Sequence, residues 1–289
     1  MIGRYLAACA LLLTVLSGCA TTEEALAVPD GIAVSVYQTR TDVVPRRLEV
    51  SFQNLTGGPL TITGVRFSAA QFVETAVWEK DSTVIPNGAT VDLPVSLPAP
   101  DCDASSSRPF VEFDYLLNDG TSGTARTEAD DRLDRLPSLQ TEDCLVDAVA
   151  DVADLSLVTP QRVGARADRP VVELDVTVRP SGASGTLTLV ALSSTTLLSP
   201  ADPATGQALT SQPLNVTIAA GDKPSVVTLL LTPGRCDPHA IAEDKRGTVM
   251  PFDVVVDGPI VDSTAGRVAV ASSDEVRGAL YAFVTAACG

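Results

Sequence analysis

Hydrophobic and polar residues alternate in short runs along most of the chain. In the first half the clearest runs are residues 48–52 and 60–65, and Thr56-Gly57-Gly58-Pro59 lies between them. In the second half they are residues 172–176 and 187–190, again with a glycine-containing segment between them. Alternation with a period of two predicts half-buried strands, and the glycine-containing separators predict turns. The pattern therefore predicts a mainly β fold.

The two halves continue with matching features. Asn87-Gly88 precedes a predicted strand and then Cys102, and Ala220-Gly221 precedes a predicted strand and then Cys236. The separations from glycine to cysteine are 14 and 15 residues. Each half then has a strand that contains a Phe-Asp pair, and each ends at a further cysteine. The same features in the same order indicate a duplicated domain.

The N-terminus has the parts of an export signal. Arg4 precedes an apolar run at residues 6–16, which is shorter than the roughly 20 residues that a membrane-spanning helix needs. The run ends in Leu16-Ser17-Gly18-Cys19, which resembles the lipobox of bacterial lipoproteins. The resemblance implies that residues 1–18 are removed as a signal peptide and that Cys19 receives acyl chains such as palmitate, which anchor the chain durably to a membrane. The alternative is an ordinary signal peptide with a cysteine near its cleavage site.

Four further cysteines remain in the exported part: Cys102, Cys144, Cys236 and Cys288. An even number of cysteines without a CxxC motif, in an oxidising compartment, predicts two disulfides. Four cysteines allow three connectivities. Because the features are duplicated, pairing within each copy is the simplest prediction, Cys102 with Cys144 and Cys236 with Cys288. Each bond would stabilise its domain by about 4 kcal/mol on the chain-entropy estimate.

The first copy also resembles a known class of domain. A strand, Asn54, Thr-Gly-Gly and then Pro-Leu-Thr-Ile-Thr resemble bacterial immunoglobulin-like domains of surface and secreted accessory proteins. The resemblance implies an antiparallel β-sandwich and brings no activity with it. We expect residues 19–30 to form a tether, residues 31–147 a first sandwich and residues 148–289 a second.

Three further predictions concern segments outside this pattern. Ser273 followed by two acids predicts a helix N-terminus, and Val276, Leu280 and Phe283 follow at helical spacing. We therefore expect a short C-terminal helix held at its end by Cys288. The acidic stretch at residues 128–134 is interpreted as a solvated loop. The domain boundary is expected within residues 148–154, with the next strand at residues 154–158.

The charge of the chain restricts its partners. The formal net charge is −16, so anionic lipid surfaces and nucleic acids repel the protein, and we expect no nucleic-acid partner. Seventeen arginines against three lysines, with many Ala, Val and Thr, indicate a high-GC genome such as that of an actinobacterium. The expected location is then the outer face of the cell membrane, or the outer membrane if the source is Gram-negative.

Candidate chemistry is sparse. His239 is the only histidine, so a Ser–His or Cys–His catalytic pair has one possible base, and no nucleophile motif accompanies it. His239 and Asp237 are the candidate ligands of a metal or small-ligand site, although one imidazole makes a poor zinc site. Asp130, Asp131 and Asp134 lack the pattern of an EF-hand. Phosphate-binding glycine motifs are absent, and no cofactor is expected. Trp78 and Tyr115 would suit a carbohydrate surface, but core packing is the expected role of Trp78.

These observations predict a membrane-anchored extracytoplasmic lipoprotein without catalytic activity, which has a binding or structural role in the cell envelope. Its partners would be the membrane, through the N-terminal lipid, and an envelope protein or glycan. Two alternatives remain open: a metal or small-ligand carrier that uses the His239 loop, and an envelope hydrolase that uses Asp or Glu.

Overall fold

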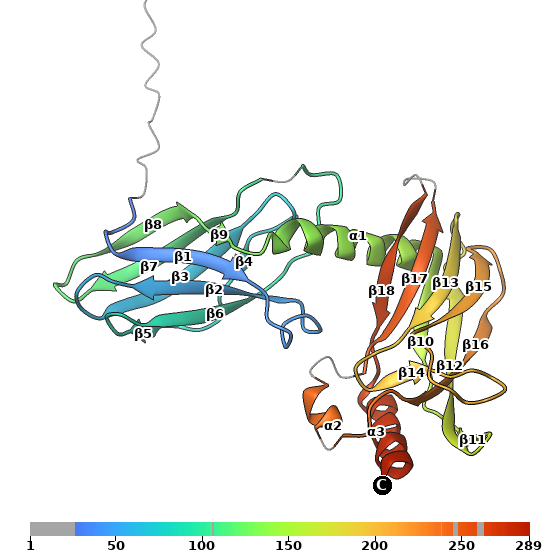
Figure 1. Ribbon diagram of the computed structural model, residues 1–289. Helices are drawn as coiled ribbons and strands as arrows, with labels where there is room; N and C mark the ends of the chain where they lie inside the picture. The colour runs from blue at the N-terminus through green and yellow to red at the C-terminus, as the bar shows by residue number, and fades with distance from the viewer. Residues whose placement is uncertain (1–26, 106, 238, 245–247, 259–262) are drawn as a thin grey trace, which may run out of the picture.

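The chain forms two β-sandwiches joined by a helix (Figure 1). The computed structural model describes residues 27–105, 107–237, 239–244, 248–258 and 263–289. The predicted signal peptide and Cys19 lie outside the described residues. The predicted fold class, two tandem immunoglobulin-like antiparallel sandwiches with a C-terminal helix, is confirmed.

The first sandwich consists of two facing sheets. One has the strand order β6-β2-β1-β9, and the other has the order β4-β3-β7-β8 with β5 also paired to β3. Strands β1 and β9 run parallel, and the other pairs are antiparallel. The strands are β1 (Ile32–Tyr37), β2 (Arg47–Asn54), β3 (Leu60–Ser68), β4 (Ala76–Val77), β5 (Thr83–Ile85), β6 (Thr90–Ser96), β7 (Phe110–Leu117), β8 (Ser122–Glu128) and β9 (Asp130–Asp131).

The second sandwich repeats this arrangement. Its sheets have the orders β10-β12-β16-β14, with β11 paired to β12, and β15-β13-β17-β18. The order β1-β2-β6 thus corresponds to β10-β12-β16, and β3-β7-β8 corresponds to β13-β17-β18. The strands are β10 (Ala153–Leu157), β11 (Arg162–Arg166), β12 (Arg169–Pro180), β13 (Thr186–Ser193), β14 (Leu198–Pro200), β15 (Ser211–Ala219), β16 (Ser225–Pro233), β17 (Met250–Asp257) and β18 (Thr264–Val270).

Alternate residues of these strands form one apolar core in each sandwich. In the first core, Phe52 on β2 meets Phe113 on β7 edge to face, with ring centroids 5.1 Å apart. Trp78 is buried in the same core, so its expected role in core packing is confirmed. Tyr115 is partly buried and packs against that core as well.

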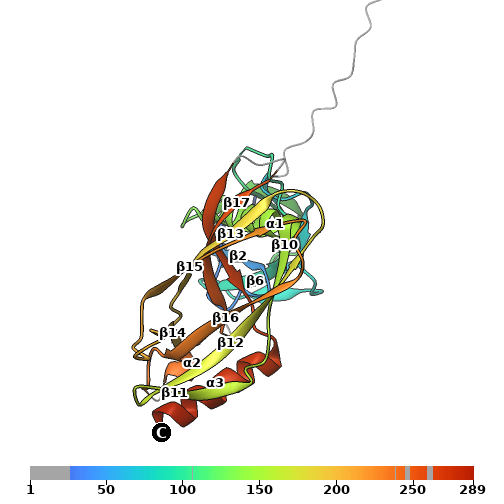
Figure 2. The ribbon, with the colours of Figure 1, turned by 90° about the vertical axis from the view of Figure 1, so that its right-hand side faces the viewer.

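Each sandwich is closed by a disulfide. Cys102 is bonded to Cys144 and Cys236 to Cys288, so the predicted pairing within each copy is confirmed. The predicted C-terminal helix is also present as α3 (Asp274–Cys288). The Ser273 hydroxyl accepts a hydrogen bond from the backbone N–H of Val276 at 3.3 Å. Helix α3 lies beside the short α2 (Ala240–Glu243). Both are at the end of the second sandwich opposite the end that α1 joins (Figure 2).

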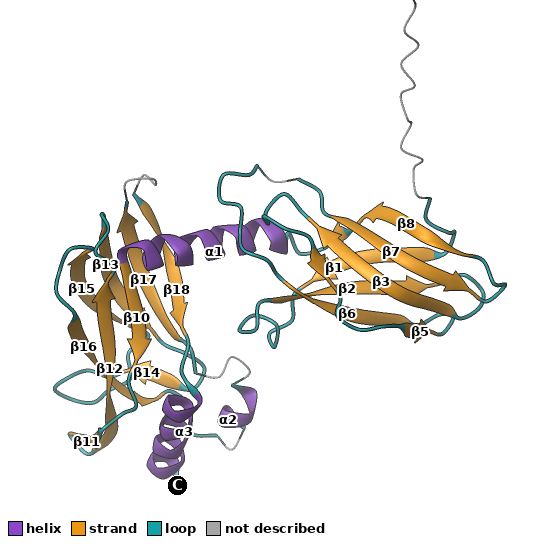
Figure 3. Cartoon of the chain, turned by 180° about the vertical axis from the view of Figure 1, so that it is seen from behind, coloured by secondary structure: helices purple, strands orange, loops and turns teal. Residues whose placement is uncertain are grey.

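The connection between the sandwiches is a helix that the sequence pattern did not predict, α1 (Arg135–Val152) (Figure 3). Leu136 and Leu139 belong to the first core, whereas Leu145, Val149 and Val152 belong to the second. At 3.6 residues per turn these two sets lie roughly 140° apart around the helix. No single apolar stripe therefore marks α1 in the sequence, because it offers opposite faces to the two sandwiches.

One smaller prediction about this region needs correction. The acidic stretch at residues 128–134 is not a loop throughout, since Glu128 ends β8 and Asp130–Asp131 form β9 beside β1. Residues 148–154, where the domain boundary is expected, contain the end of α1 and the start of β10. The chain passes from one core to the other inside α1, between Leu139 and Leu145.

Polar contacts hold α1 on the first sandwich. Arg46, in the loop after β1, forms a 2.6 Å ion pair with Asp143. Burial raises the pKa of Asp143, although the neighbouring Arg46 acts in the opposite direction. The Gln140 side-chain amide donates to the carbonyl oxygens of Asp101 and Ala104, at 2.6 and 3.0 Å. Together with the Cys144 disulfide, these contacts fix the first half of α1.

Candidate binding site

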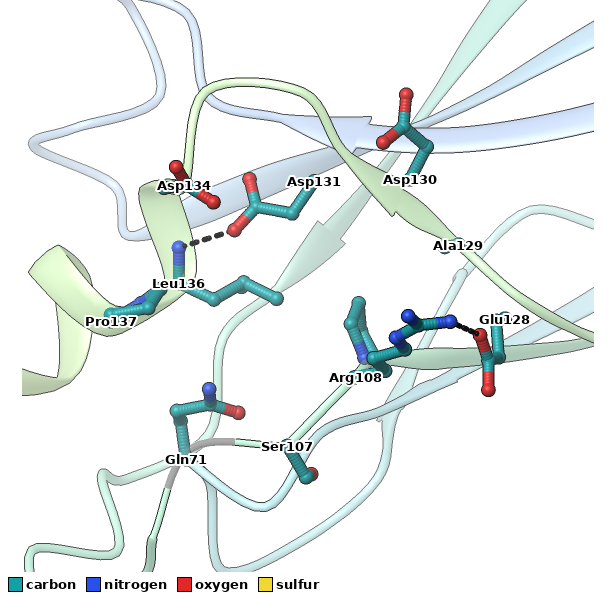
Figure 4. Close-up of a pocket in the computed structure, with 11 residues that line it drawn as sticks. Gln71, Ser107, Arg108, Glu128, Ala129, Asp130, Asp131, Asp134, Leu136 and Pro137 are labelled. Atoms are coloured by element: carbon teal, nitrogen blue, oxygen red, sulfur yellow. Dashed lines mark hydrogen bonds and ion pairs between the residues drawn. The ribbon is translucent and has the colours of Figure 1, made fainter.

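A pocket of about 650 Å³ lies where the first sandwich meets the start of α1 (Figure 4). This volume is within the usual range of small-ligand sites. Strands β8 and β9 supply one wall, the first residues of α1 supply another, and the loops before β4 and β7 supply the rest. Its lining residues are Gln71, Ser107, Arg108, Pro109, Glu128, Ala129, Asp130, Asp131, Asp134, Leu136 and Pro137.

Asp131 has a structural role at the top of the pocket. Its two carboxylate oxygens accept hydrogen bonds from the backbone N–H groups of Arg135 and Leu136, both at 2.9 Å. The residue at the N-cap position itself, Asp134, makes no side-chain cap and has a left-handed backbone with φ of 47°. Asp131, which lies on β9, therefore caps α1. It accepts hydrogen bonds from backbone amides that have no acceptor within the first turn of the helix.

Arg108 is the only cation among the lining residues, and it is already paired. Its guanidinium donates to Glu128, another lining residue, at 2.6 Å. The Arg108 side chain is 80% exposed, so this pair adds little to stability. It does, however, offset the positive charge that would otherwise attract an anion.

Gln71 lies on the opposite side of the pocket from the aspartates, close to Ser107 and below Leu136 (Figure 4). The residue is only 1% exposed, and its backbone carbonyl accepts a bond from Asp101 N–H at 2.8 Å. Its side-chain oxygen has no hydrogen-bond partner among the described residues. A buried acceptor without a donor costs roughly 1–3 kcal/mol, so this amide needs an explanation.

The pocket is thus acceptor-rich. Its lining has four carboxylates and one guanidinium. Within the described part of the chain, the side chains of Asp130 and Asp134 form no hydrogen bond or ion pair. The strongest donors, the Arg108 guanidinium and the first amides of α1, are committed to Glu128 and Asp131. The arrangement favours a ligand that brings its own donors and positive charge.

This site was only partly visible in the sequence. The sequence draws attention to the acids at positions 130, 131 and 134, which lack the pattern of an EF-hand, but it does not single out Gln71 or Arg108. Nothing in their local sequence marks them, because they reach the pocket from loops far from β9 along the chain. Among the described residues, no group of three or more His, Cys, Asp or Glu side chains is arranged to hold a metal ion.

The candidate residues of the second sandwich lie elsewhere. Asp237 is in an ion pair with Arg235, with 2.8 Å between Nε and Oδ2, and it accepts the backbone N–H of His239 at 3.2 Å. His239 is exposed and precedes α2. No third ligand joins these two residues in the described part of the chain. A metal or ligand role for His239 and Asp237 stays a prediction.

Among the described residues, no helix has the length and apolar character needed to cross a bilayer. Lipidation at Cys19 concerns a residue outside this range.

No family model matches the sequence, and no curated protein sequence matches it. Among solved structures, a red sea bream transglutaminase is similar at 11% identity and a TM-score of 0.25, over 85% of this chain and 32% of that one. The BSP domain of a biofilm associated protein is similar at 9% identity and a TM-score of 0.20, over 92% and 63% of the two chains. The YadV chaperone is similar at 13% identity and a TM-score of 0.20, over 82% and 99%.

The chain thus spans about a third of the transglutaminase and less than two thirds of the BSP-domain chain. TM-scores at this level carry no argument about the present protein. The pairing of its own strands defines its architecture.

Proposed function

We propose that this protein is a lipid-anchored extracytoplasmic protein that binds a partner in the cell envelope and has no catalytic activity. The observation that carries the proposal is the acceptor-rich pocket at the start of α1. Its central acid, Asp131, is committed to backbone amides, and Glu128 is committed to Arg108. Asp130 and Asp134 lack an orienting partner among the described residues. A catalytic acid pair needs carboxylates that other groups hold in place, so binding fits this pocket better than hydrolysis.

The position of α1 supports a second part of the proposal. The helix is part of both cores, so the two sandwiches are connected by a rigid element instead of a flexible linker. The first described residues lie at the end of the first sandwich remote from the second (Figures 1 and 3). A short lipid-bearing tether before them would place the first sandwich near the membrane and the second beyond it.

Lipidation is tested by labelling with an alkyne analogue of palmitate in a bacterial host, with Cys19→Ser as the variant. We expect the wild type to be labelled and recovered with membranes, and the variant to be unlabelled. Equal labelling of the two chains would contradict the anchor at Cys19. Cys9→Ser is the matched control, because this cysteine lies within the segment that the signal peptidase would remove, and it should leave labelling unchanged.

The binding role is tested in the same cells by crosslinking. A photoreactive residue in place of Ser107, at the pocket, is expected to give a discrete adduct in intact cells. The same residue in place of Lys223, on the second sandwich, is the control. Adducts that are equal at both positions, or absent at Ser107, would argue against a binding site at the pocket.

A further inference from the structure

We infer that the pocket at the start of α1 takes an organic cation with N–H donors, an alkylammonium or guanidinium group on an aliphatic stem. The inference rests on the proposed binding function and names its ligand class. It begins from the imbalance in the pocket between acceptors and donors. Four carboxylates and one guanidinium line it, so its net charge attracts cations.

The second observation is independent of the acids. The Gln71 side chain is 1% exposed, lines the same pocket, and has an oxygen without a partner among the described residues. An acceptor of this kind is satisfied by an N–H or O–H donor. A ligand that brings donors to both sides of the pocket would pair with Gln71 at one end and with an aspartate at the other.

The remaining lining residues decide among the possible cations. Pro109, Ala129, Leu136 and Pro137 give the pocket apolar surface along which methylene groups can pack. No aromatic ring is among the described residues that line the pocket, so these residues do not form the cage that quaternary ammonium groups prefer. The described residues also lack a cluster that could hold a metal ion. A primary amine or guanidinium is therefore the class that fits, either as a free amine or as a Lys or Arg side chain of a partner.

The test is calorimetric titration of the full chain in a neutral detergent with n-butylammonium, n-butylguanidinium, butyltrimethylammonium, butanol and Ca²⁺. We expect the first two to bind about tenfold more tightly than butyltrimethylammonium, which has the same charge and no donor. Butanol and Ca²⁺ are expected not to bind. Binding should weaken as NaCl is added. Absence of amine binding at millimolar concentration, or preferential binding of Ca²⁺ or butanol, would overturn the inference.

Three variants locate the site. Asp134→Asn and Gln71→Met are each expected to weaken butylammonium binding about tenfold, whereas Asp81→Asn, with the same change of charge on an exposed loop, should leave it unchanged. Gln71→Met also separates binding from folding, because removing a buried oxygen without a hydrogen-bond partner among the described residues should leave the thermal stability equal or higher. Equal loss in Asp81→Asn, or no loss in Asp134→Asn, would place the binding elsewhere and refute the site.

A lysine-containing pentapeptide and its acetyl-lysine form distinguish the two sources of the cation. Tighter binding of the lysine peptide than of butylammonium indicates a partner protein, and equal binding indicates a small amine. If no cation binds to a chain that is labelled at Cys19 and crosslinked at position 107, the inference that the ligand is an organic cation is refuted. The proposed binding function in the envelope then stands. Loss of labelling and crosslinking would instead overturn the proposed function.

Discussion

Asp114 on β7 and Asp253 on β17 occupy equivalent positions in the two sandwiches. Each follows a buried phenylalanine, and each lies opposite a β-bulge in the neighbouring strand. In the first sandwich the register shifts between Ile62 and Gly64, and Gly64 pairs with Asp114. In the second it shifts between Leu189 and Ala191, and Ala191 pairs with Asp253. The same irregularity at the same place supports the duplication of one domain.

In both sandwiches an arginine and a hydroxyl bind this carboxylate, but each comes from a different strand in the two copies. Asp114 is held by Arg66 of β3, through contacts of 3.0 and 3.2 Å, and by the Thr124 hydroxyl of β8 at 2.6 Å. In the second sandwich the arginine, Arg267, comes from β18 at 2.7 Å, and the hydroxyl, Ser193, comes from β13 at 3.2 Å. Both copies thus keep one arginine and one hydroxyl around the carboxylate, which indicates that the contact itself stabilises the sheet.

We predict that Asp114→Asn destabilises the first sandwich in a pH-dependent way. The hydrogen bond from Arg66 lowers the pKa of Asp114, and Thr124 acts in the same direction. A carboxyl whose pKa is lower in the folded state stabilises the fold above its unfolded pKa, and this contribution is lost as the pH falls through the folded value. The variant should cost roughly 1 kcal/mol at pH 6, since the pair is partly exposed, and the difference from wild type should shrink below about pH 4.

Urea unfolding followed by tryptophan fluorescence measures this difference. Trp78 is the only tryptophan of the chain and lies in the first core, so its signal reports on that sandwich. Asp92→Asn, which removes an exposed carboxylate bonded to Tyr37, controls for the change in net charge. A cost that stays constant from pH 6 to pH 2 would show that Asp114 acts through packing and not through its charge.

A second prediction concerns the disulfide between Cys102 and Cys144. The two cysteines are 42 residues apart, and closing a loop of this length stabilises the folded state by about 4 kcal/mol on the chain-entropy estimate. Replacing both by serine should therefore shift the fluorescence transition of Trp78 strongly toward lower urea. The disulfide between Cys236 and Cys288 closes the second sandwich. Replacing these two cysteines by serine should therefore shift the fluorescence transition of Trp78 much less. Equal shifts would show that the two sandwiches unfold as one unit.

The strands, the disulfide pairing and α3 could be predicted because local signals and the repeat specify them. Ser273 and the spacing of Val276, Leu280 and Phe283 mark α3 within one short segment. Helix α1 has no such marker, since its cap comes from Asp131 of β9 and its apolar residues face two different cores. The repeat nevertheless contains a signal for α1 in the spacing of its buried residues before Cys144.

Helices α1 and α3 each contain the second cysteine of a disulfide, and in both the buried residues lie at the same distances before that cysteine. Leu136 and Leu139 precede Cys144 by eight and five residues, and Leu280 and Phe283 precede Cys288 by the same numbers. All four side chains are buried. Extending the repeat to its last cysteine would therefore have predicted a helix before Cys144. The pocket could not be predicted in this way, because the contact of Gln71 with the start of α1 depends on how distant loops pack.

A third prediction separates two neighbouring acids of the pocket. Asp131→Ala removes the cap of α1, because Asp131 accepts from both Arg135 and Leu136, and it should cost about 1–2 kcal/mol. Asp130→Ala removes a carboxylate without a partner among the described residues and should change stability by less than about 0.5 kcal/mol. Urea unfolding of the two variants measures the contrast. Equal effects would mean that the cap is not supplied by Asp131.

The last prediction concerns α1 as the connection between the sandwiches. Its second half packs closely on β18: a Cβ at Gly266 would lie only 2.6 Å from the Leu145 side chain. Asp147 is exposed and lies between Leu145 and Val149. In an α-helix its backbone N–H bonds the carbonyl of residue 143, which lies between the two sets of buried residues. Proline at this position removes a backbone hydrogen bond and clashes with the preceding turn, at a cost of about 3 kcal/mol. Asp147→Pro should therefore break the helix between the two cores and loosen the arrangement of the sandwiches.

Double electron–electron resonance measures this arrangement. Nitroxides on noncanonical residues in place of Lys80 and Lys223, one in each sandwich, leave the native cysteines paired. We expect a narrow distance distribution in the wild type and in Asp147→Ala, because alanine keeps the helix, and a broad distribution in Asp147→Pro. A distribution that stays narrow with proline would mean that contacts other than α1 hold the two sandwiches together. A distribution that is already broad in the wild type would contradict the rigid connection on which the extended arrangement at the membrane depends.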